Sequence, residues 1–404
     1  MWRKECVVLV AVCFASALAG CGSDDGGGQQ QTLSIGVLAP LDAGLTQFGL
    51  GIRNSVQLAV DEANESDLIP GWRIEVVAVD DSSDPAVGMR NAVQLVDDPT
   101  IIGVVGTYNS GVASAVLPDF QAADIALVSP GNTNPSLTLG PDRNNPVRPY
   151  SNYFRMVAND AQQGGFLAQY AAGRFDTPAA AVITDEKPVS QGLANDFRAG
   201  FEAFGGVITS FEVVPEGDTN YMPFAINAAA TNPDLLFFGG EYDHAALLKQ
   251  AAIAAGLHVP LMGGDGIQAD EYISAAGAAA EGDLASSVGT PVELEPGGLV
   301  FLGAYESRGF GEPPSNFGPY AYDAANILLS AATRALAGRD EIDGAVRASV
   351  IADVQSITNA TLLNPSGAVT GTIGFNAFGD TVNPVLTVYR VEAGRWVPQR
   401  QTSP

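Results

Sequence analysis

The chain alternates between short runs of β-branched and other apolar residues and longer segments in which apolar residues recur every three or four positions. The short runs predict strands at Leu33–Ala39, Arg73–Val79, Gly103–Val105, Ala126–Val128, Ala180–Ile183, Val207–Val213, Leu235–Phe238 and Pro260–Met262. The periodic segments predict helices at Gln47–Glu62, Pro85–Val96, Ser110–Ala122, Ala161–Ala172, Gln191–Phe204 and Tyr242–Ala255. Such alternation is typical of parallel sheets covered by helices on both faces. Because these strands are more than one compact open sheet needs, we expect two lobes with one sheet each.

The rest of the chain is expected to complete the two lobes. Leu284–Pro296 is polar and contains proline, which favours a crossover from one lobe to the other. Further helices are predicted at Pro319–Leu336 and Glu341–Val354. Final strands are predicted at Thr370–Phe375 and Val385–Val391, with a turn at 392–394.

The N-terminal residues indicate the compartment. Arg3 and Lys4 precede an apolar run from Cys6 to Ala19, which has the layout of a signal peptide and is too short to span a bilayer comfortably. The run ends in Leu18-Ala19-Gly20-Cys21, which resembles the lipobox of bacterial lipoproteins, where the cysteine is lipidated. An ordinary signal peptide with an incidental cysteine is the alternative.

A polar tract follows Cys21 and contains no residue that could enter a core, so it predicts a flexible tether. We therefore expect a signal peptide at 1–20 and a lipidated cysteine with its tether at 21–32. The domain would be extracytoplasmic and anchored to the cell membrane, in a periplasm or on the outer face of the cytoplasmic membrane.

Charge and cysteine content narrow the possible partners. The chain has 45 Asp plus Glu against 19 Lys plus Arg, and its formal net charge of −26 excludes nucleic acid as a natural partner. Cys6, Cys13 and Cys21 are its three cysteines, so the expected mature domain has no intramolecular disulfide. No later segment has 18 uninterrupted apolar residues, and we expect the rest of the chain to lie outside the membrane.

Polar residues follow two strands of the first predicted lobe, where ligands bind in open parallel sheets. Ser110 follows the strand at 103–105 and begins the next helix, so its hydroxyl and the free helix amides suit a carboxylate. A plain helix cap explains Ser110 equally well. Thr133 and Gly131 lie in the loop after 126–128 and offer a hydroxyl and a carbonyl, or form only a structural turn.

The second predicted lobe places acidic residues at its strand ends. Glu241 follows Gly239-Gly240, and Asp265 follows Gly263-Gly264. Carboxylates at these positions would suit a cationic group. In so acidic a protein they are also expected simply as exposed loop residues.

A set of segments in family-like order and spacing resembles the leucine/isoleucine/valine-binding protein family, from about Leu33 to Trp396. The segments are Ile35-Gly36-Val37-Leu38-Ala39-Pro40-Leu41, Asp80-Asp81-Ser82-Ser83-Asp84-Pro85, Val104-Val105-Gly106, Val128-Ser129-Pro130-Gly131-Asn132-Thr133-Asn134-Pro135-Ser136-Leu137-Thr138 and Phe154-Arg155. The resemblance implies the α/β fold of type I periplasmic binding proteins, in which two Rossmann-like lobes with parallel-sheet cores are joined by three crossovers. The implied lobes are 33–157 with 287–362, and 158–286 with 363–398.

The same resemblance implies roles for several residues. Ser110 and Thr133 match positions that hold a ligand carboxylate, and Gly131 matches one whose carbonyl accepts an ammonium hydrogen. Asp265 falls where the family has an acidic residue for the α-ammonium, with a shorter side chain here. Asn109, the residue before Ser110, joins the candidate site.

Three further positions complete the candidate site. Glu241 and Val189 fall where the family often has aromatic residues, so the side-chain pocket departs from the family pattern. Glu241 suggests a second cationic or hydrogen-bonding group on the ligand. Phe48 matches an aromatic position at the cleft edge, with a core phenylalanine as the alternative.

Catalytic and metal sites find little support in the sequence. His244 and His258 are 14 residues apart, and neither a zinc framework nor a nucleophile elbow or phosphate-binding loop is present. Asp80, Asp81 and Asp84 lack EF-hand spacing and favour a turn and helix cap over calcium. We expect no enzyme, no cofactor and no resident metal.

The function implied by the resemblance is a solute-binding lipoprotein of an ABC importer. Its ligand would be an amino acid, branched-chain or polar or basic, or a related small molecule bound between closing lobes. Its partners would be that ligand, an ABC transporter permease and, through the lipid, the membrane. The alternative is a lipoprotein sensor that signals to a membrane receptor without transport.

Overall fold

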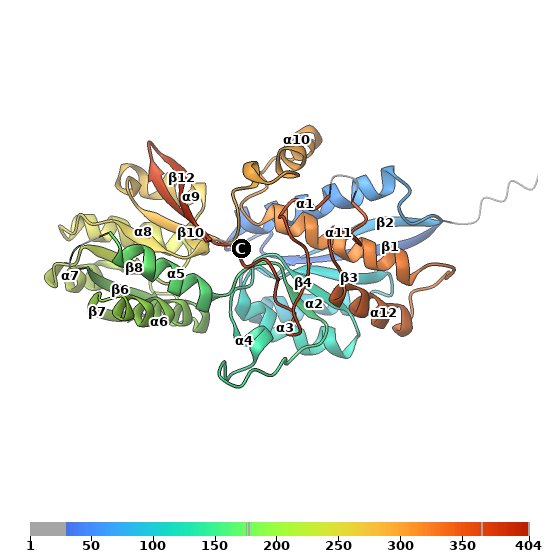
Figure 1. Cartoon of the computed structure of the whole chain (residues 1–404), viewed down its shortest axis with the longest axis horizontal. Coiled ribbons are helices and arrows are strands. Elements are labelled where there is room, and N and C mark those ends of the chain that lie inside the picture. Colours follow the sequence, from blue (N-terminus) through green and yellow to red (C-terminus); the bar gives the residue numbers. More distant parts are fainter. Residues whose placement is uncertain (1–29, 175, 177, 365–366, 403–404) are drawn as a thin grey trace, which may run out of the picture.

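The computed structural model describes residues 30–174, 176, 178–364 and 367–402, which form two α/β lobes side by side (Figure 1). The predicted signal peptide, Cys21 and most of the predicted tether lie outside the described residues. Gln31 and Thr32, expected in the tether, are instead the first two residues of a strand. Within the described part of the chain, no helix is long and apolar enough to cross a membrane.

The first lobe is built on a five-stranded parallel sheet with the order β2-β1-β3-β4-β5. Its strands are β1 (Gln31–Ala39), β2 (Trp72–Asp80), β3 (Ile101–Gly106), β4 (Ala126–Ser129) and β5 (Tyr153–Arg155). Its helices are α1 (Thr46–Glu65), α2 (Pro85–Asp97), α3 (Ser110–Ala122), α4 (Ser136–Leu139), α11 (Gly318–Ala335) and α12 (Gly344–Gln355).

Alternating side chains of this sheet face two separate helical layers. Val37 of β1 and Val105 of β3 belong to the hydrophobic cluster that includes α1 and α11. Their neighbours Leu38 and Val104 belong to the cluster that includes α2 and α3. Because both faces are covered, the central strands β3 and β4 are buried along their whole length, whereas the edge strand β2 alternates buried and exposed residues.

The second lobe is built on a seven-stranded sheet with the order β12-β11-β10-β9-β8-β6-β7. Its strands are β6 (Ala179–Asp185), β7 (Val207–Val214), β8 (Leu235–Phe238), β9 (Leu261–Gly263), β10 (Leu284–Ser287), β11 (Thr387–Glu392) and β12 (Arg395–Gln401). Its helices are α5 (Asp160–Ala172), α6 (Pro188–Ala203), α7 (Met222–Ala230), α8 (Tyr242–Ala254) and α9 (Asp270–Ala276), with 3₁₀ turns η1 (Asp265–Ile267) and η2 (Gly277–Ala280). The β6 to β10 pairings are parallel, whereas β11 pairs antiparallel with both β10 and β12.

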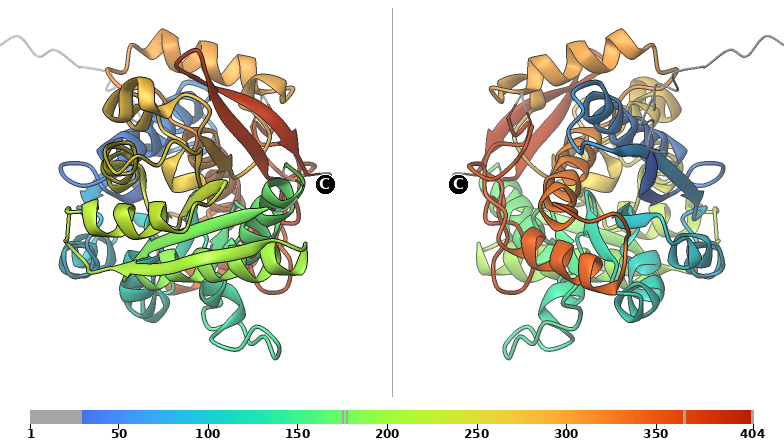
Figure 2. Two further views of the ribbon diagram at one scale, coloured as in Figure 1. Left: turned by 90° about the vertical axis from the view of Figure 1, so that its left-hand side faces the viewer. Right: turned by 90° about the vertical axis from the view of Figure 1, so that its right-hand side faces the viewer.

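The chain passes between the lobes three times, from β5 to α5, from β10 to α11 and from α12 to β11. The second passage carries η3 (Val292–Leu294) and α10 (Gly298–Arg308). Helix α10 and the β11–β12 hairpin lie on the same side of the molecule (Figure 2). The predicted fold class is therefore confirmed, and the residue limits proposed for each lobe stay a prediction.

The elements predicted from the sequence differ from the structure mainly in the C-terminal third of the chain. Thr370–Phe375, predicted as a strand, forms only an isolated bridge from Phe375 to Thr381. Gly371 and Gly374 have φ of 86° and 159°, and the carboxylate of Asp323 accepts the Thr370 amide hydrogen that a strand would give to its neighbour. The expected crossover at 284–296 begins with strand β10, and α9, α10 and β12 were not predicted. Earlier in the chain, β5 and α7 were not predicted either.

Candidate functional site

A small cavity of about 50 Å³ lies where the strand ends of the two lobes face each other. Apart from Phe48, every predicted ligand-binding residue lines it. The lining residues are Tyr108, Asn109, Ser110, Gly131, Thr133, Asp160, Val189, Ser190, Leu193, Gly239, Gly240, Glu241, Asp265 and Gly266.

On the side of the first lobe, Ser110 connects two loops. Asn109 is the N-cap of α3, so Ser110 is the first helical residue and its hydroxyl does not cap its own helix. The Ser110 Oγ instead accepts hydrogen bonds from the backbone amides of Thr133 and Asn134, both at 3.2 Å. The helix-cap explanation for Ser110 is therefore wrong, and the hydroxyl stands beside the free amides at the start of α3.

The loop after β4 is held against this helix end by close packing and hydrogen bonds. A Cβ at Gly131 would lie 3.0 Å from the Tyr108 ring and 3.2 Å from the Phe317 ring, so a side chain would push the loop away. The buried Asn132 donates from its amide to the Tyr108 carbonyl at 2.7 Å. These contacts fix the positions of the Gly131 and Thr133 backbone at the cavity.

On the side of the second lobe, Asp265 is held by a buried glutamine. The side-chain amide of Gln163, on α5, donates to Asp265 Oδ1 at 2.9 Å, and its Oε1 accepts the Asp265 amide hydrogen at 2.8 Å. Ser286 donates to the same Gln163 Oε1 at 2.7 Å and fixes the orientation of the glutamine. Burial raises the pKa of Asp265 to about 6, so this carboxyl is mostly ionised at neutral pH.

Asp160, which the sequence reading missed, is a second acidic residue at the cavity. It is the first residue of α5, and its amide donates to the Thr133 carbonyl at 2.9 Å. Burial, aided by the charge of Asp265, raises the pKa of Asp160 to about 8. Its buried Oδ2 atom has no hydrogen-bond partner among the described residues. The capping box of Asn159 and Gln162 marked this helix start, but not its place beside the cavity.

Glu241 is paired within the protein. Its Oε1 accepts from Asn109 Nδ2 at 2.7 Å, and its Oε2 accepts from Lys187 Nζ at 2.8 Å. Burial raises the pKa of Glu241, and the Lys187 ammonium opposes that rise. Because Glu241 already has a cation, the suggestion of a second cationic group on the ligand loses its basis. The Asn109 bond also joins the two lobes directly across the cavity.

Phe48 belongs to an aromatic cluster beside the cavity and not to its lining. Its buried ring lies 4.8 Å from Tyr108, 5.4 Å from Tyr242 and 5.0 Å from Phe317, measured between ring centroids. Because Tyr242 begins α8 of the second lobe, this cluster also bridges the lobes. Phe48 acts here as a core residue on one side and lines a second cavity on the other.

The acidic residues considered for calcium have structural roles. Asp84 caps α2 by accepting from the amides of Ala86 and Val87, as predicted.

The structure likewise shows no metal site at the histidines or elsewhere in its described part. His244 forms a hydrogen bond with the Tyr221 hydroxyl. No group of three or more His, Cys, Asp or Glu side chains that could hold a metal ion occurs among the residues described.

Comparisons with known proteins agree with this architecture. A family model described as periplasmic binding protein matches residues 32–395. The chain is 29% identical over 387 residues to the Leu/Ile/Val-binding protein homolog 2 of Brucella abortus (strain 2308), covering 96% of this chain and 95% of the relative.

Two solved structures of similar fold are each 25% identical in sequence. The leucine-binding protein LivK from Thermotoga maritima MSB8 superposes with a TM-score of 0.79, covering 92% of this chain and 99% of LivK. The branched-chain amino acid transporter substrate-binding protein LivJ from Streptococcus pneumoniae, solved in complex with isoleucine, superposes with a TM-score of 0.76, covering 91% of this chain and 100% of LivJ.

Proposed function

Since the chain belongs to the periplasmic binding protein family, we propose that it is the extracytoplasmic solute-binding lipoprotein of an ABC importer and binds a small amino acid between its lobes. The observation that carries the proposal is the distribution of polar groups around the cavity. Hydroxyls and helix amides face it from the first lobe, and the Asp265 carboxylate faces it from the second. This is the complement of a zwitterion.

The ligand carboxylate would lie against Ser110, Thr133 and the amides at the start of α3, where the helix dipole favours negative charge. The ammonium would lie between the Gly131 carbonyl and Asp265.

The size of the cavity favours a compact side chain. A volume of about 50 Å³ corresponds to only a few water-sized positions, since one needs roughly 10–15 Å³. Glu241, which is paired with Lys187, and Val189 form part of its wall. Contacts from both lobes form only when the lobes are together, so ligand would favour closure, which the permease would recognise. Lipidation of Cys21 would keep the protein at the membrane.

The test is a thermal-shift screen of the purified protein against the proteinogenic amino acids, their amides and short organic acids, followed by calorimetry. A ligand at 100 times its dissociation constant adds about 2.7 kcal/mol and raises the melting temperature. We expect hits among small α-amino acids, and Asp265→Ala should weaken them by about 1.5–3 kcal/mol. Hits confined to amides or organic acids, or an unchanged affinity in the variant, would refute the assignment. If the protein serves transport, it should restore solute uptake by a permease. If it is a sensor, it should bind the ligand without restoring uptake.

A further inference from the structure

A buried glutamine, Gln163, contacts Asp265 at two points. Its side-chain nitrogen donates to the Asp265 carboxylate at 2.9 Å, and its side-chain oxygen accepts the Asp265 backbone amide hydrogen at 2.8 Å. Because a backbone amide can only donate, the oxygen of the glutamine has to face it, and the nitrogen has to face the carboxylate. One amide group therefore holds both the main chain and the side chain of Asp265, which limits rotation of the carboxylate.

Gln163 acts on the small cavity from behind its wall. Asp265 is among the described residues that line this cavity, whereas Gln163 is not, and the Gln163 side chain is fully buried. The residue before Asp265 is Gly264, and a Cβ added there would lie 2.5 Å from the Gln163 side-chain oxygen. The glycine thus permits the close approach of the glutamine, which reaches a ligand only through Asp265.

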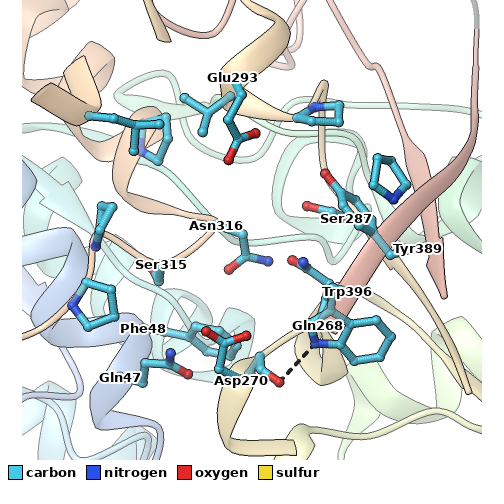
Figure 3. Close-up of a pocket in the computed structure, with 18 of the residues that line it drawn as sticks. Gln47, Phe48, Gln268, Asp270, Ser287, Glu293, Ser315, Asn316, Tyr389 and Trp396 are labelled. Atoms are coloured by element: carbon cyan, nitrogen blue, oxygen red, sulfur yellow. Dashed lines mark hydrogen bonds between the residues drawn. The ribbon is translucent and has the colours of Figure 1, made fainter. Parts of the chain in front are cut away.

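The orientation of the glutamine is fixed from β10. The buried Ser286 of this strand donates to the Gln163 side-chain oxygen at 2.7 Å. Successive side chains of a strand point to opposite faces, and the next residue, Ser287, lines the second and larger cavity of about 710 Å³ (Figure 3). One face of β10 therefore supports the glutamine, and the other forms part of the wall of the larger cavity.

The first turn of α5 also reaches the other half of the site. Asp160, the first residue of this helix, donates its backbone amide hydrogen to the Thr133 carbonyl at 2.9 Å. Asp160 and Gln163 are three positions apart, so they are neighbours on one side of the helix. A single helical turn thus connects the loop proposed for the ligand carboxylate with the residue proposed for the ammonium.

Gln163 is the one side chain in the described part of the chain that donates a hydrogen bond to the Asp265 carboxylate. The other titratable groups around Asp265 are Asp160 of α5, Glu241 before α8 with its partner Lys187, and Tyr108 after β3. The two acidic groups disfavour a negative charge on Asp265, and the lysine is paired with Glu241. The hydrogen bond from Gln163 therefore has a large share in stabilising the ionised carboxylate.

We propose that Gln163 is a positioning residue of the amino-acid site, which aims the Asp265 carboxylate at the ligand ammonium through the hydrogen bond that it donates. The inference rests on the proposed function and adds to it a residue that the ligand does not touch. Since the donated bond favours the ionised form, its loss should raise the pKa of Asp265 from about 6 by about one unit.

The first test is calorimetry of Gln163→Met at pH 6 and pH 8, with the amino acid found in the screen. A rise of about one unit lowers the ionised fraction of Asp265 about fivefold at pH 6 and only by about a tenth at pH 8. The variant should therefore lose about fivefold more affinity at pH 6 than at pH 8. The matched control is Gln162→Met, which replaces the exposed neighbour in the capping box of the same helix and should change the affinity less than twofold at either pH.

The second test needs no ligand. Carbon-13 NMR of the protein labelled in its aspartate carboxyl groups follows the titration of Asp265, whose signal is assigned by its absence in Asp265→Asn. We expect a raised pKa in Gln163→Met and an unchanged one in Gln162→Met. Ser286→Ala, a smaller change in the same network, should shift the pKa in the same direction and serves if Gln163→Met folds poorly.

An unchanged pKa of Asp265 in both Gln163→Met and Ser286→Ala would overturn the proposal. Equal loss of affinity at pH 6 and pH 8 would also overturn it, because a purely structural disturbance weakens binding at both pH values alike. A screen without amino-acid hits would refute the proposed function, and the NMR titration would still show whether Gln163 controls Asp265.

Discussion

The raised pKa of Asp265 makes ligand affinity depend on pH in a defined direction. Burial raises this pKa to about 6, and an ammonium group beside the carboxyl favours its ionised form. Binding of a zwitterionic amino acid therefore releases a proton below pH 6. The affinity should rise as the pH rises from 5 to 7.

The size of the effect follows from the fraction of Asp265 that is ionised before ligand binds. With a pKa of about 6, roughly nine-tenths is ionised at pH 7 and roughly one-tenth at pH 5. The dissociation constant should therefore be about tenfold larger at pH 5, equivalent to about 1.4 kcal/mol. The α-carboxyl of a free amino acid titrates well below pH 5 and its α-amino group well above pH 7, so the ligand itself changes little over this range. Asp160, with its pKa of about 8, stays protonated throughout.

Calorimetry with the amino acid found in the screen, at pH 5, 6 and 7, measures this dependence, and Asp265→Asn is the control. Asp81, Asp283 and Asp323 also have pKa values raised to about 7, 6 and 6, and they remain in the variant. The variant should bind more weakly at pH 7 and show a flat profile. A tenfold slope that persists in Asp265→Asn would assign the proton to another group, and a flat wild-type profile would refute the role of Asp265.

Three other predictions concern the described contacts. Asn109→Ala removes a charge-assisted bond between the lobes and should weaken the amino-acid ligand by about tenfold in calorimetry, whereas unchanged affinity would separate this bond from closure. Lys249→Met leaves the buried Asp283 without its cation at 2.7 Å and should lower the free energy of unfolding by about 3–5 kcal/mol in urea titrations. Adding Asp283→Asn should recover part of that loss, and no recovery would mean that packing dominates. Burial raises the pKa of Asp81 above its unfolded value to about 7, so its contribution to stability is present at low pH and is lost as the pH rises through 7. Asp81→Asn should therefore raise the urea midpoint more at pH 9 than at pH 5, and an equal change at both pH values would contradict the shift.

The candidate site was predictable where it depends on the ends of parallel strands. Glycine pairs end β8 and β9, and Glu241 and Asp265 follow them directly, so the topology alone brings these two side chains to one edge. Ser110 and Thr133 lie at the corresponding edge of the other sheet for the same reason. The family resemblance added the expected role of each residue.

The parts that were missed depend on contacts between distant segments. Gln163 meets Asp265 across 102 positions, and Lys187 meets Glu241 across 54. The local pattern around Asp160 and Gln163 predicts a helix but not which of its residues turn toward the cleft. Lys187, likewise, precedes an ordinary helix start in the sequence. Pairing of this kind is decided by how helices pack on the second sheet.

The distribution of basic residues explains why the ligand should supply the cation at the smaller cavity. The described part of the chain contains two lysines, and each is paired with a carboxylate: Lys187 with the partly buried Glu241, and Lys249 with the buried Asp283. Asp265 forms no ion pair with any described basic side chain and is held only by the neutral amide of Gln163 and nearby backbone. An ionised carboxyl buried without a counter-ion is costly, and an ammonium group from the ligand removes that cost. The cleft therefore gains most from a ligand that carries a positive charge to Asp265 and a negative one to the start of α3.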